Sequence, residues 1–357
     1  MDVSTGSQRF ERAHEQLAER FNRLAHDPLA PPVAFGSFTF DPDDADSILV
    51  VPEVVVHRRA GTMWAVSEAA PALRDVAPST EAHDFRLRYA GSSMPETGWL
   101  EAVAVAVKEI EATELDKVVL ARDIKVWSKA PFDVKVLLAR LAQRFPECYT
   151  FSCAGLVGAT PELLVGRYGD SASSLVLAGS ARRGASHEED DAIGARLLAS
   201  AKDVSEHTPS VASVAEALGP VCKNLDVGAP HLLKLANVQH IATRVTGQLA
   251  KPLSALQLAG RLHPSAAICG APTLVALDAI RKLEGMKRSR YAGPVGWVDA
   301  NGDGEFGIAL RCMEVEGAAG RLFAGGGIVA ASEPEAELEE TRLKFRAVLA
   351  ALEGAAH

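Results

Sequence analysis

The stretch VGWVDANGDGEFGIAL, residues 295–310, is the part of the sequence that decides the fold class. Apolar residues form both flanks, Val295 to Val298 and Phe306 to Leu310, and the middle is rich in Asn, Asp and Gly. Two apolar runs joined by Asn-Gly or Asp-Gly predict a β-hairpin, because these residues tolerate the positive φ angles of a tight turn. We therefore expect an antiparallel strand pair here, with Asn301-Gly302 and Asp303-Gly304 supplying the residues with positive φ.

The same turn also matches the first half of a calcium-binding loop. Residues 299–304 follow the pattern D-x-N-x-D-G, and the twelfth position of such a loop must be a bidentate Glu. Here the twelfth position is Leu310. The hairpin is therefore the favoured interpretation.

Strand and helix patterns extend outward from this hairpin over the rest of the chain. Apolar runs predict strands at 33–64, 117–121, 149–177 and 231–249, then up to 315 and at 322–329. Helical spacing predicts helices at 10–24, 99–110, 134–145, 190–218, 255–262, 273–283 and 335–352, with Pro209 interrupting the fourth. Adjacent strands followed by grouped helices favour an α+β fold with antiparallel sheets, because a doubly wound fold would alternate single strands with single helices.

Length and local composition bound the domain organisation. A chain of 357 residues is long enough for two domains or one large one. The small, polar, Pro- and Gly-bearing stretch 88–98 is the best candidate for a junction. We therefore separate an N-terminal segment, residues 1–94, from a C-terminal region, residues 95–357.

Composition argues against several functional classes. The formal net charge is -9, which disfavours a basic surface and hence a nucleic-acid partner. Five cysteines are scattered with no C-x-x-C pair, a pattern that fits a reduced cytoplasmic protein better than a zinc site or a disulfide framework. No apolar run approaches the ~18 residues that span a bilayer. Walker, dinucleotide-binding, zincin and nucleophile-elbow motifs are absent from the sequence.

Four charged residues stand inside apolar or Gly-rich segments, where an unpaired charge is costly. They are Lys117, Glu162, Arg311 and Lys344. Each also has an ordinary structural explanation: a lysine at the head of a strand can be a solvated edge residue, a Glu after Pro can begin a helix, and an Arg in a strand can pair with a carboxylate. Taken singly, these positions do not establish a site.

Six ordered motifs around these residues carry a family resemblance. The sequence contains DKVVLAR (116–122), GATPELL (158–164), LAGSARR (177–183), LHP (262–264), LFAGGGIV (322–329) and ELEET (337–341). Over residues 97–352 the chain resembles the chorismate-utilising enzymes, which include component I of anthranilate synthase, and within them the isochorismate synthases. The resemblance implies one α+β body in which large antiparallel sheets pack together with helices on the outside, and to which the N-terminal segment contributes strands.

The resemblance also implies a reaction, the Mg²⁺-dependent and reversible isomerisation of chorismate to isochorismate. Water adds at ring C2 and the C4 hydroxyl leaves. The addition needs a base, and a lysine can serve only if burial or a nearby cation lowers its pKa from about 10.4. The departing hydroxyl needs a proton from an acid whose pKa is raised toward neutrality. By resemblance, Lys117 is the base and Glu162 is the acid.

Further residues receive binding roles by the same resemblance. A dicarboxylate entering a protein of net charge -9 needs local positive charge or backbone N–H groups. Mg²⁺ prefers oxygen ligands; Glu206 and Glu340 match its ligands in the family, and Glu337 assists through water. The positions assigned to the substrate are Ala178, Gly179, His240, Ile268, Tyr291, Arg311, Gly325, Gly326 and Lys344.

Other branches of the family provide the alternatives. Anthranilate and aminodeoxychorismate synthases use ammonia and need no lysine to activate water, and tryptophan-inhibited relatives carry a Leu-Leu-Glu-Ser stretch that is absent here. We therefore expect no glutaminase subunit. Salicylate synthases, which go on to eliminate pyruvate, are the main alternative: Ile268 favours an isochorismate synthase, whereas Tyr291 resembles the salicylate branch. A silent chorismate-binding protein is disfavoured, because binding alone would need neither Lys117 nor Glu162.

The setting of the reaction follows from the same considerations. We expect a cytoplasmic enzyme that acts on a small molecule, without a membrane or nucleic-acid partner. Nothing in the sequence requires more than a monomer. The product would enter menaquinone or siderophore synthesis, depending on the enzymes that act next.

Overall fold

The computed structural model describes residues 3–24, 30–59, 61–67 and 84–354. Its helices are α1 (Arg9–Asn22), α2 (Glu96–Ala112), α3 (Val134–Arg144), α4 (His187–Ala199), α5 (Ala201–Leu218), α6 (Ala255–Leu262), α7 (Thr273–Leu283) and α8 (Pro334–Glu353), with a 3-10 turn, η1 (Gly219–Val221), after α5. Its strands are β1 (Val33–Ser37), β2 (Ile48–Val50), β3 (Val54–Arg59), β4 (Thr62–Ser67), β5 (Arg88–Tyr89), β6 (Lys117–Trp127), β7 (Tyr149–Cys153), β8 (Leu156–Thr160), β9 (Leu163–Tyr168), β10 (Ser171–Arg182), β11 (Cys222–Val227), β12 (His231–Lys234), β13 (Val238–Leu249), β14 (Gly270–Ala271), β15 (Pro294–Asp299), β16 (Gly304–Ile308), β17 (Cys312–Glu316) and β18 (Ala319–Ile328).

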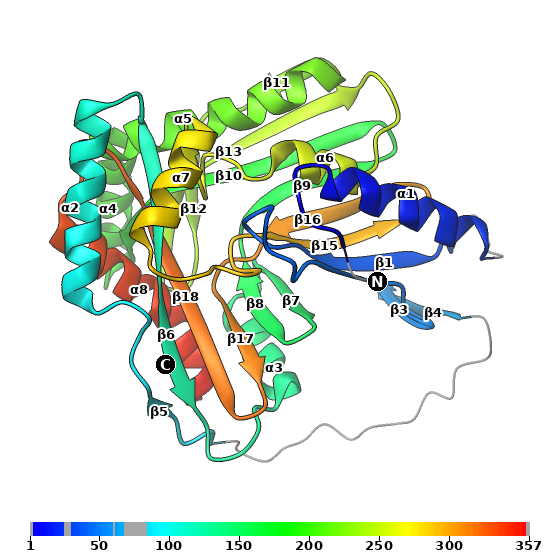
Figure 1. Cartoon of the computed structure of the whole chain (residues 1–357), viewed down its shortest axis with the longest axis horizontal. Helices are drawn as coiled ribbons and strands as arrows, with labels where there is room; N and C mark the ends of the chain where they lie inside the picture. The colour runs from blue at the N-terminus through cyan, green and yellow to red at the C-terminus, as the bar shows by residue number, and fades with distance from the viewer. Residues whose placement is uncertain (1–2, 25–29, 60, 68–83, 355–357) are drawn as a thin grey trace.

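Two large antiparallel sheets form the body of the molecule (Figure 1). The first has the order β11-β13-β10-β9-β16-β15-β1-β2, with β12 on β13, and the second has the order β14-β6-β18-β17-β8-β7, with β5 on β6. Helices α4 and α5 pack against β10 and β13, whereas α2, α7 and α8 pack on the sheet that holds β6 and β18. The predicted α+β architecture, with packed antiparallel sheets and outer helices, is confirmed. Within the described ranges, no helix has the length and apolar character needed to cross a membrane.

The predicted hairpin forms in the first sheet. Strands β15 and β16 pair in antiparallel register from Pro294↔Ile308 to Val298↔Gly304. In the turn, Asp299 Oδ1 accepts hydrogen bonds from the backbone N–H groups of residues 301 and 303, each at 2.9 Å. Of residues 301–304, only Gly302 has a positive φ, at +83°. The expectation of positive φ at Asn301 and at Asp303-Gly304 is therefore wrong, because Gly304 already lies in β16.

The N-terminal segment shares both sheets with the rest of the chain. Strand β1 pairs with β15 from Val33↔Asp299 to Ser37↔Val295, and α1 packs against α6. The candidate junction 88–98 contains β5, which pairs with β6, and the first turn of α2. Strand pairing thus joins the N-terminal segment to the C-terminal region in both sheets.

The helical region 190–218 divides at Ser200 and not at Pro209. Ser200 Oγ accepts a hydrogen bond from the Asp203 N–H at 3.2 Å, which caps the start of α5. Pro209 lies inside α5, where a proline removes one backbone hydrogen bond at a penalty of about 3 kcal/mol. Packing of α5 against β10 and β13 outweighs that penalty, so the predicted interruption is wrong.

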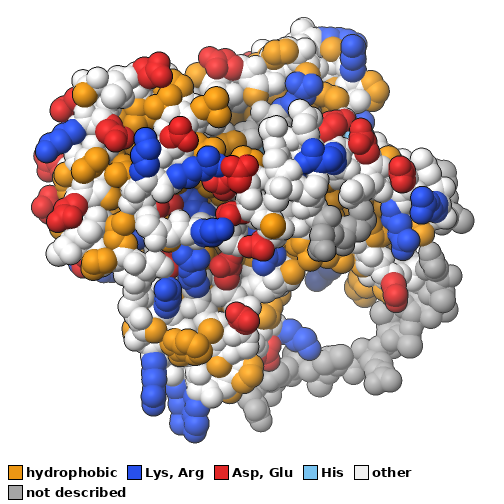
Figure 2. All heavy atoms as spheres, viewed as in Figure 1, with side chains coloured by type: hydrophobic (Ala, Val, Ile, Leu, Met, Phe, Trp, Pro, Cys, Tyr) orange, Lys and Arg blue, Asp and Glu red, His pale blue; other side chains and the backbone are white. Residues whose placement is uncertain are grey.

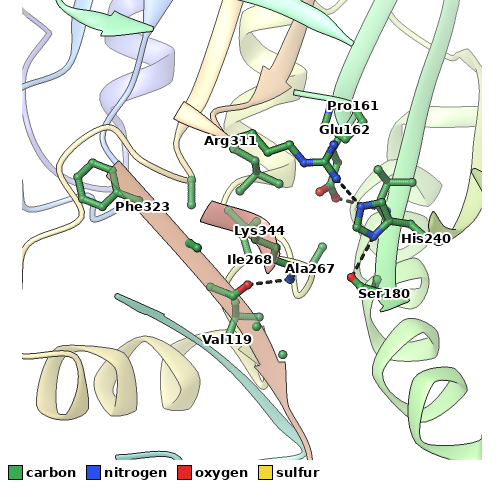
Figure 3. Close-up of a pocket in the computed structure, with 18 of the residues that line it drawn as sticks. Val119, Pro161, Glu162, Ser180, His240, Ala267, Ile268, Arg311, Phe323 and Lys344 are labelled. Atoms are coloured by element: carbon green, nitrogen blue, oxygen red, sulfur yellow. Dashed lines mark hydrogen bonds between the residues drawn. The ribbon is translucent and has the colours of Figure 1, made fainter. Parts of the chain in front are cut away.

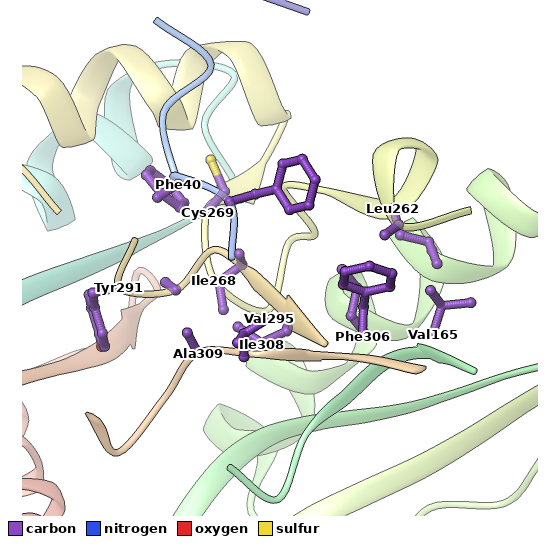
Figure 4. Packing of buried hydrophobic residues seen from close by; sticks show 14 of the residues in the cluster. Phe40, Val165, Leu262, Ile268, Cys269, Tyr291, Val295, Phe306, Ile308 and Ala309 are labelled. Carbon is purple, nitrogen blue, oxygen red and sulfur yellow. The ribbon is translucent and has the colours of Figure 1, made fainter. Parts of the chain in front are cut away.

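The larger hydrophobic cluster draws buried residues from strands of both sheets and from the helices that pack on them; Figure 4 shows part of it. Val165 from β9, Phe306 from β16 and Leu262 from α6 are buried together, beside Ile268 and Tyr291 of the connecting segments. Burying each large apolar side chain contributes about 1.5–3 kcal/mol. Because Ile268 and Tyr291 also face the pocket described next, the core holds part of the wall of the site.

Candidate active site

A pocket opens where β6, β10, β13, β18, α5 and α8 meet. The space free of protein atoms in it is about 750 Å³ and includes open solvent. Most of the residues that the sequence singles out line it: Glu162, Ala178, Gly179, Glu206, His240, Ile268, Tyr291, Arg311, Gly325, Gly326 and Lys344. Lys117, Glu337 and Glu340 are not among the lining residues, and each contacts the site through a neighbour described below.

Glu162 stands between β8 and β9, directly after Pro161, and faces the pocket (Figure 3). Its side chain is buried, and one carboxyl oxygen accepts a hydrogen bond from the Leu177 N–H at 3.4 Å. Burial raises the pKa of Glu162 to about 8, because the charged form loses its hydration. Near neutral pH the carboxyl group therefore carries a proton that it can donate.

Lys117 is the first residue of β6 and is 0% exposed. Its Nζ donates hydrogen bonds to the Ser210 hydroxyl at 2.9 Å and to the Glu206 carbonyl at 3.1 Å, and lies 3.6 Å from Glu206 Oε1. Burial lowers the pKa of Lys117, against the opposing effect of the Glu206 and Glu162 carboxylates. The explanation as a solvated edge lysine is wrong, and a buried amine that loses its proton readily can act as a base.

Arg311, His240 and Ser180 form a chain of hydrogen bonds along one wall (Figure 3). Arg311 Nη2 donates to His240 Nε2 at 2.6 Å, and His240 Nδ1 lies 3.0 Å from Ser180 Oγ. Since a guanidinium only donates, Nε2 must be the acceptor and the ring proton is on Nδ1. Burial and the Arg311 charge hold the pKa of His240 well below its usual value, which keeps the imidazole neutral.

The geometry leaves part of Arg311 available to a ligand. Its backbone is in the left-handed region, with φ at 47°, and its side chain is buried. In the described part of the chain Nη1 makes no hydrogen bond, although the Cys148 side chain interacts with the guanidinium. A buried, always charged N–H group without a partner suits an anionic ligand such as a carboxylate.

Three carboxylates gather over the glycine segment 325–327 of β18. A methyl group added at Gly327 would lie 2.2 Å from Glu206 Oε1, and one added at Gly326 would lie 3.2 Å from Glu337 Oε2 and 3.8 Å from Glu340 Oε1. Glu206 comes from α5 and the other two come from α8. Only glycine gives these carboxylates room beside the strand.

Each of these carboxylates lies next to a lysine. Glu206 Oε1 is 3.6 Å from Lys117, Glu340 Oε1 is 2.7 Å from Lys344, and Glu337 Oε1 is 2.7 Å from Lys202. Lys344 Nζ also donates to the Gly325 carbonyl at 2.7 Å. Burial opposes the charge on Lys344, but Glu340 raises its pKa overall, so Lys344 stays a cation at the pocket wall.

The oxygen atoms of these three carboxylates are ligands of the kind that a hard divalent cation prefers. Among the described residues, no three His, Cys, Asp or Glu side chains are arranged to hold a metal ion as they stand. All three candidates are nevertheless oxygen donors of the kind that Mg²⁺ prefers. Glu337 is 1% exposed, and its Oε2 has no hydrogen-bond donor among the described residues. A buried carboxylate oxygen without a hydrogen-bond donor lowers the stability of the folded protein unless a ligand supplies the missing contact.

Tyr291 and Ile268 complete the apolar side of the pocket. The Tyr291 ring stacks on Phe323, with ring centroids 4.9 Å apart and planes 7° apart. The Ile268 carbonyl accepts a hydrogen bond from Arg288 Nη1 at 2.8 Å. Both side chains are therefore held in place by buried neighbours.

The sequence patterns do not indicate several residues of this site. Ser180 contacts His240, Ser210 contacts Lys117, and Lys202 contacts Glu337. Ser210 stands one helical turn after Glu206, so the i, i+4 spacing could have indicated it. No sequence pattern links the other two contacts, which join segments that are distant in the chain.

Comparison with known proteins places this geometry in a family. The family model described as "Chorismate binding enzyme" matches residues 2–353. The isochorismate synthase DhbC of Bacillus subtilis is 36% identical, over 97% of this chain and 87% of that protein. A solved structure, the putative 2,3-dihydroxybenzoate-specific isochorismate synthase DhbC of Bacillus anthracis, is 33% identical with a TM-score of 0.82, over 96% of this chain and 89% of that one. The menaquinone-specific isochorismate synthase MenF of Escherichia coli is 25% identical with a TM-score of 0.81, over 99% and 84%.

Proposed function

The chain belongs to the chorismate-binding enzymes, and from this premise we propose that it is an isochorismate synthase, an isomerase that interconverts chorismate and isochorismate. The observation that carries the proposal is a pair of buried groups with opposite pKa shifts at one site. Burial raises the pKa of Glu162 to about 8 and lowers the pKa of Lys117. An acid and a base whose environments favour their neutral forms are what a hydroxyl exchange requires.

The chemistry can be written from these two residues. Neutral Lys117 takes a proton from water as the oxygen bonds to ring C2. The double bonds of the ring shift, and the C4–O bond breaks as Glu162 gives its proton to the departing hydroxyl, which leaves as water. One water enters and one leaves, so the product is an isomer of the substrate. Transfer of a proton from Lys117 back to Glu162 through solvent restores both groups.

Cations and backbone groups hold the two carboxylates of the substrate. Arg311 and Lys344 line the pocket, and His240 fixes Arg311 through its hydrogen bond. Gly325 and Gly326 let backbone N–H groups approach the ligand closely. Ala178 and Gly179 line the ring, with Ile268 and Tyr291 on the apolar side.

Mg²⁺ is the cofactor in this proposal. Glu206 and Glu340 would hold it, with Glu337 assisting through water. When bound, the ion would offset the negative charge of a substrate carboxylate. The support is the convergence of these carboxylates at Gly326 and Gly327 and the unsatisfied Glu337 Oε2.

The proposal extends to partners and setting. We infer a monomer in the cytoplasm that needs no glutaminase subunit and binds no nucleic acid. Acidic and basic side chains are interspersed over the face drawn in Figure 2, which supports a surface without a role in binding a polyanion. The product would serve menaquinone or siderophore synthesis, since the matched relatives include a menaquinone-specific and a 2,3-dihydroxybenzoate-specific enzyme.

The test is an assay of the purified protein with chorismate, with and without Mg²⁺, followed by chromatography of the products. A parallel sample contains ammonium. Isochorismate that forms only with Mg²⁺ is the expected result, and Lys117→Ala should abolish turnover while the protein still binds chorismate. Salicylate with equimolar pyruvate would identify a salicylate synthase, the branch that Tyr291 resembles. Anthranilate formed with ammonium, or unchanged activity of Lys117→Ala, would contradict the role of Lys117.

A further inference from the structure

Two acceptors on α5 hold the amine of Lys117. Its Nζ lies 2.9 Å from the hydroxyl oxygen of Ser210 and 3.1 Å from the carbonyl oxygen of Glu206. Lys117 and Ser210 are each 0% exposed, so bulk solvent does not reach either side chain. The position of the amine is therefore set by contacts within the protein.

The direction of the Ser210 hydroxyl is set by its own helix. Ser210 Oγ donates to the Glu206 carbonyl, one turn earlier in α5, at 3.2 Å, which is a usual contact for a serine inside a helix. A hydroxyl group has one proton and two acceptor lone pairs. Because the proton is given to the helix, Ser210 contacts the Lys117 amine as an acceptor.

These contacts also orient the lone pair of the neutral amine. A neutral lysine has two N–H groups and one lone pair, and only the lone pair can take up a proton. When the N–H groups point to Ser210 and to the Glu206 carbonyl, the lone pair points away from both oxygens. Lys117 and Val119 are two residues apart in β6, so they lie on the same face of that strand, and Val119 lines the pocket (Figure 3).

We propose that Ser210 is a positioning residue for the base: its hydroxyl holds the Lys117 amine in the orientation that accepts a proton, and it stabilises the ammonium that results. The inference rests on the role of Lys117 in the proposed function. Ser210 is not among the residues that line the pocket. Its effect is therefore exerted through Lys117 and not through contact with the substrate.

The hydrogen bond to Ser210 is stronger in the transition state than in the ground state. As the oxygen of water bonds to ring C2, a proton of that water passes to Nζ, and the amine becomes an ammonium. Hydrogen bonds from a charged donor are roughly twice as strong as those from a neutral donor. An interaction that strengthens in the transition state raises kcat and leaves substrate binding unchanged.

The experiment compares the steady-state kinetics of Ser210→Ala with those of the wild-type protein. Consumption of chorismate in the presence of Mg²⁺ is followed by chromatography. In Ser210→Ala kcat should fall about tenfold, which corresponds to about 1.4 kcal/mol and is the size expected for one hydrogen bond to a charged group. The KM for chorismate should stay at the wild-type value, because the pocket wall is unchanged.

Three further variants separate the hydroxyl group from packing. Ser210→Thr keeps a hydroxyl at this position and should retain most of the wild-type kcat. Ser210→Cys has nearly the same shape but a weak acceptor, so its kcat should fall, and it provides the test if Ser210→Ala does not fold. Ser213→Ala is the matched control: Ser213 Oγ donates to the Ser210 carbonyl at 2.9 Å and accepts from the Ala266 N–H at 3.2 Å. Neither contact involves Lys117, so this variant should lose stability with no change in kcat.

The outcomes distinguish the role of Ser210 from the proposed function. A wild-type kcat in Ser210→Ala, or an equal loss of kcat in Ser210→Ala and Ser210→Thr, would overturn the role of Ser210 while leaving Lys117 as the base. A rise in KM without a fall in kcat would overturn it as well. A wild-type protein that does not consume chorismate would overturn the proposed function and the role of Ser210 together.

Discussion

At the scale of single residues, Glu162 is the group on which the proposed chemistry depends most directly. Its proton must be present when the C4 hydroxyl leaves. Glu162→Gln keeps the shape of the side chain but cannot donate an acidic proton, so kcat should fall by at least about 100-fold. Chorismate binding, measured by calorimetry, should change little. A variant that retains wild-type kcat would exclude Glu162 as the acid.

The pH dependence of kcat gives a second measurement on the same residue. Because the pKa of Glu162 is raised to about 8, the protonated and active form prevails below that pH. Activity is therefore lost as the pH rises through about 8. On the acidic side, activity should fall as Lys117 becomes protonated. Glu305→Gln is the control: Glu305 is half buried, burial raises its pKa as it does that of Glu162, and it lines a different pocket. Its pH profile should match wild type.

Gly327 offers a test of the carboxylate cluster that leaves every charged residue in place. Its φ is not positive, so alanine fits the backbone, but its Cβ would lie 2.2 Å from Glu206 Oε1. Gly327→Ala should displace Glu206 and raise the Mg²⁺ concentration for half-maximal turnover at least about tenfold. Gly166→Ala, in β9, meets nothing closer than 3.4 Å and should behave as wild type. An unchanged Mg²⁺ requirement in Gly327→Ala would contradict the role of Glu206.

The sequence could single out residues that line the pocket, whereas it could not indicate most of the contacts between them. Lys117 and Glu162 stood out because charge inside apolar segments needs an explanation. The contact between Arg311 and His240 joins residues 71 apart, and that between Lys202 and Glu337 joins residues 135 apart. Such contacts depend on how strands and helices are oriented in space, which periodicity does not report.

At the scale of elements, the sequence predicted most helices and strands but not their neighbours. Periodicity located β6 and β18, yet nothing in either segment indicates that they pair from Trp127↔Ala319 to Val118↔Ile328. The sequence analysis places an interruption at Pro209, whereas the helical region divides at Ser200, whose side chain caps α5. Strand pairing and the continuation of α5 through Pro209 depend on tertiary packing, which local patterns do not report.

The bulge in β10 provides the prediction at this scale. The register of β10 against β13 shifts between Ala178 and Ser180, and Gly179 has φ at +78°. Alanine there is strained by about 1–2 kcal/mol, and its Cβ would crowd Asp203 and Ile241 at 3.2 Å. Gly179→Ala should therefore lose stability in urea unfolding and raise the KM for chorismate, because the bulge forms part of the pocket wall.

The matched control for the bulge is Gly169→Ala. Gly169 also has a positive φ, at +61°, but nothing lies within 4 Å of its Cβ position. It should lose a similar amount of stability with no change in KM. If both variants raised the KM equally, the effect would come from general destabilisation and not from the pocket wall.

At the scale of the whole molecule, the site connects the two sheets. Glu206 is on α5, which packs against β10 and β13 of the first sheet, and Glu340 is on α8, which packs against β18 of the second. The net charge of -9 describes the whole chain and does not reveal that two cationic side chains line the pocket. The folding of distant segments brings Arg311 and Lys344 to one wall, and this local balance is what suits a dicarboxylate.

A ligand that contacts both helices should therefore stabilise the protein as a whole. Binding to the folded state at 100 times the Kd contributes about 2.7 kcal/mol, which for a protein of this size raises the Tm by roughly 4 °C. We expect such a shift when Mg²⁺ is added to Glu162→Gln with chorismate, a variant that should not consume the substrate. Removal of Mg²⁺ with a chelator should reverse the part of the shift that the ion contributes.

The control adds Glu206→Gln and Glu340→Gln to the same background, which removes one proposed Mg²⁺ ligand from each helix. This protein should lose the Mg²⁺-dependent shift, because neutral amides bind the ion far more weakly than carboxylates. Differential scanning calorimetry measures each state with and without the ion. An equal Mg²⁺ shift in the variant and its parent would mean that Mg²⁺ stabilises the protein from elsewhere, since no ligand would then join α5 to α8 through these carboxylates.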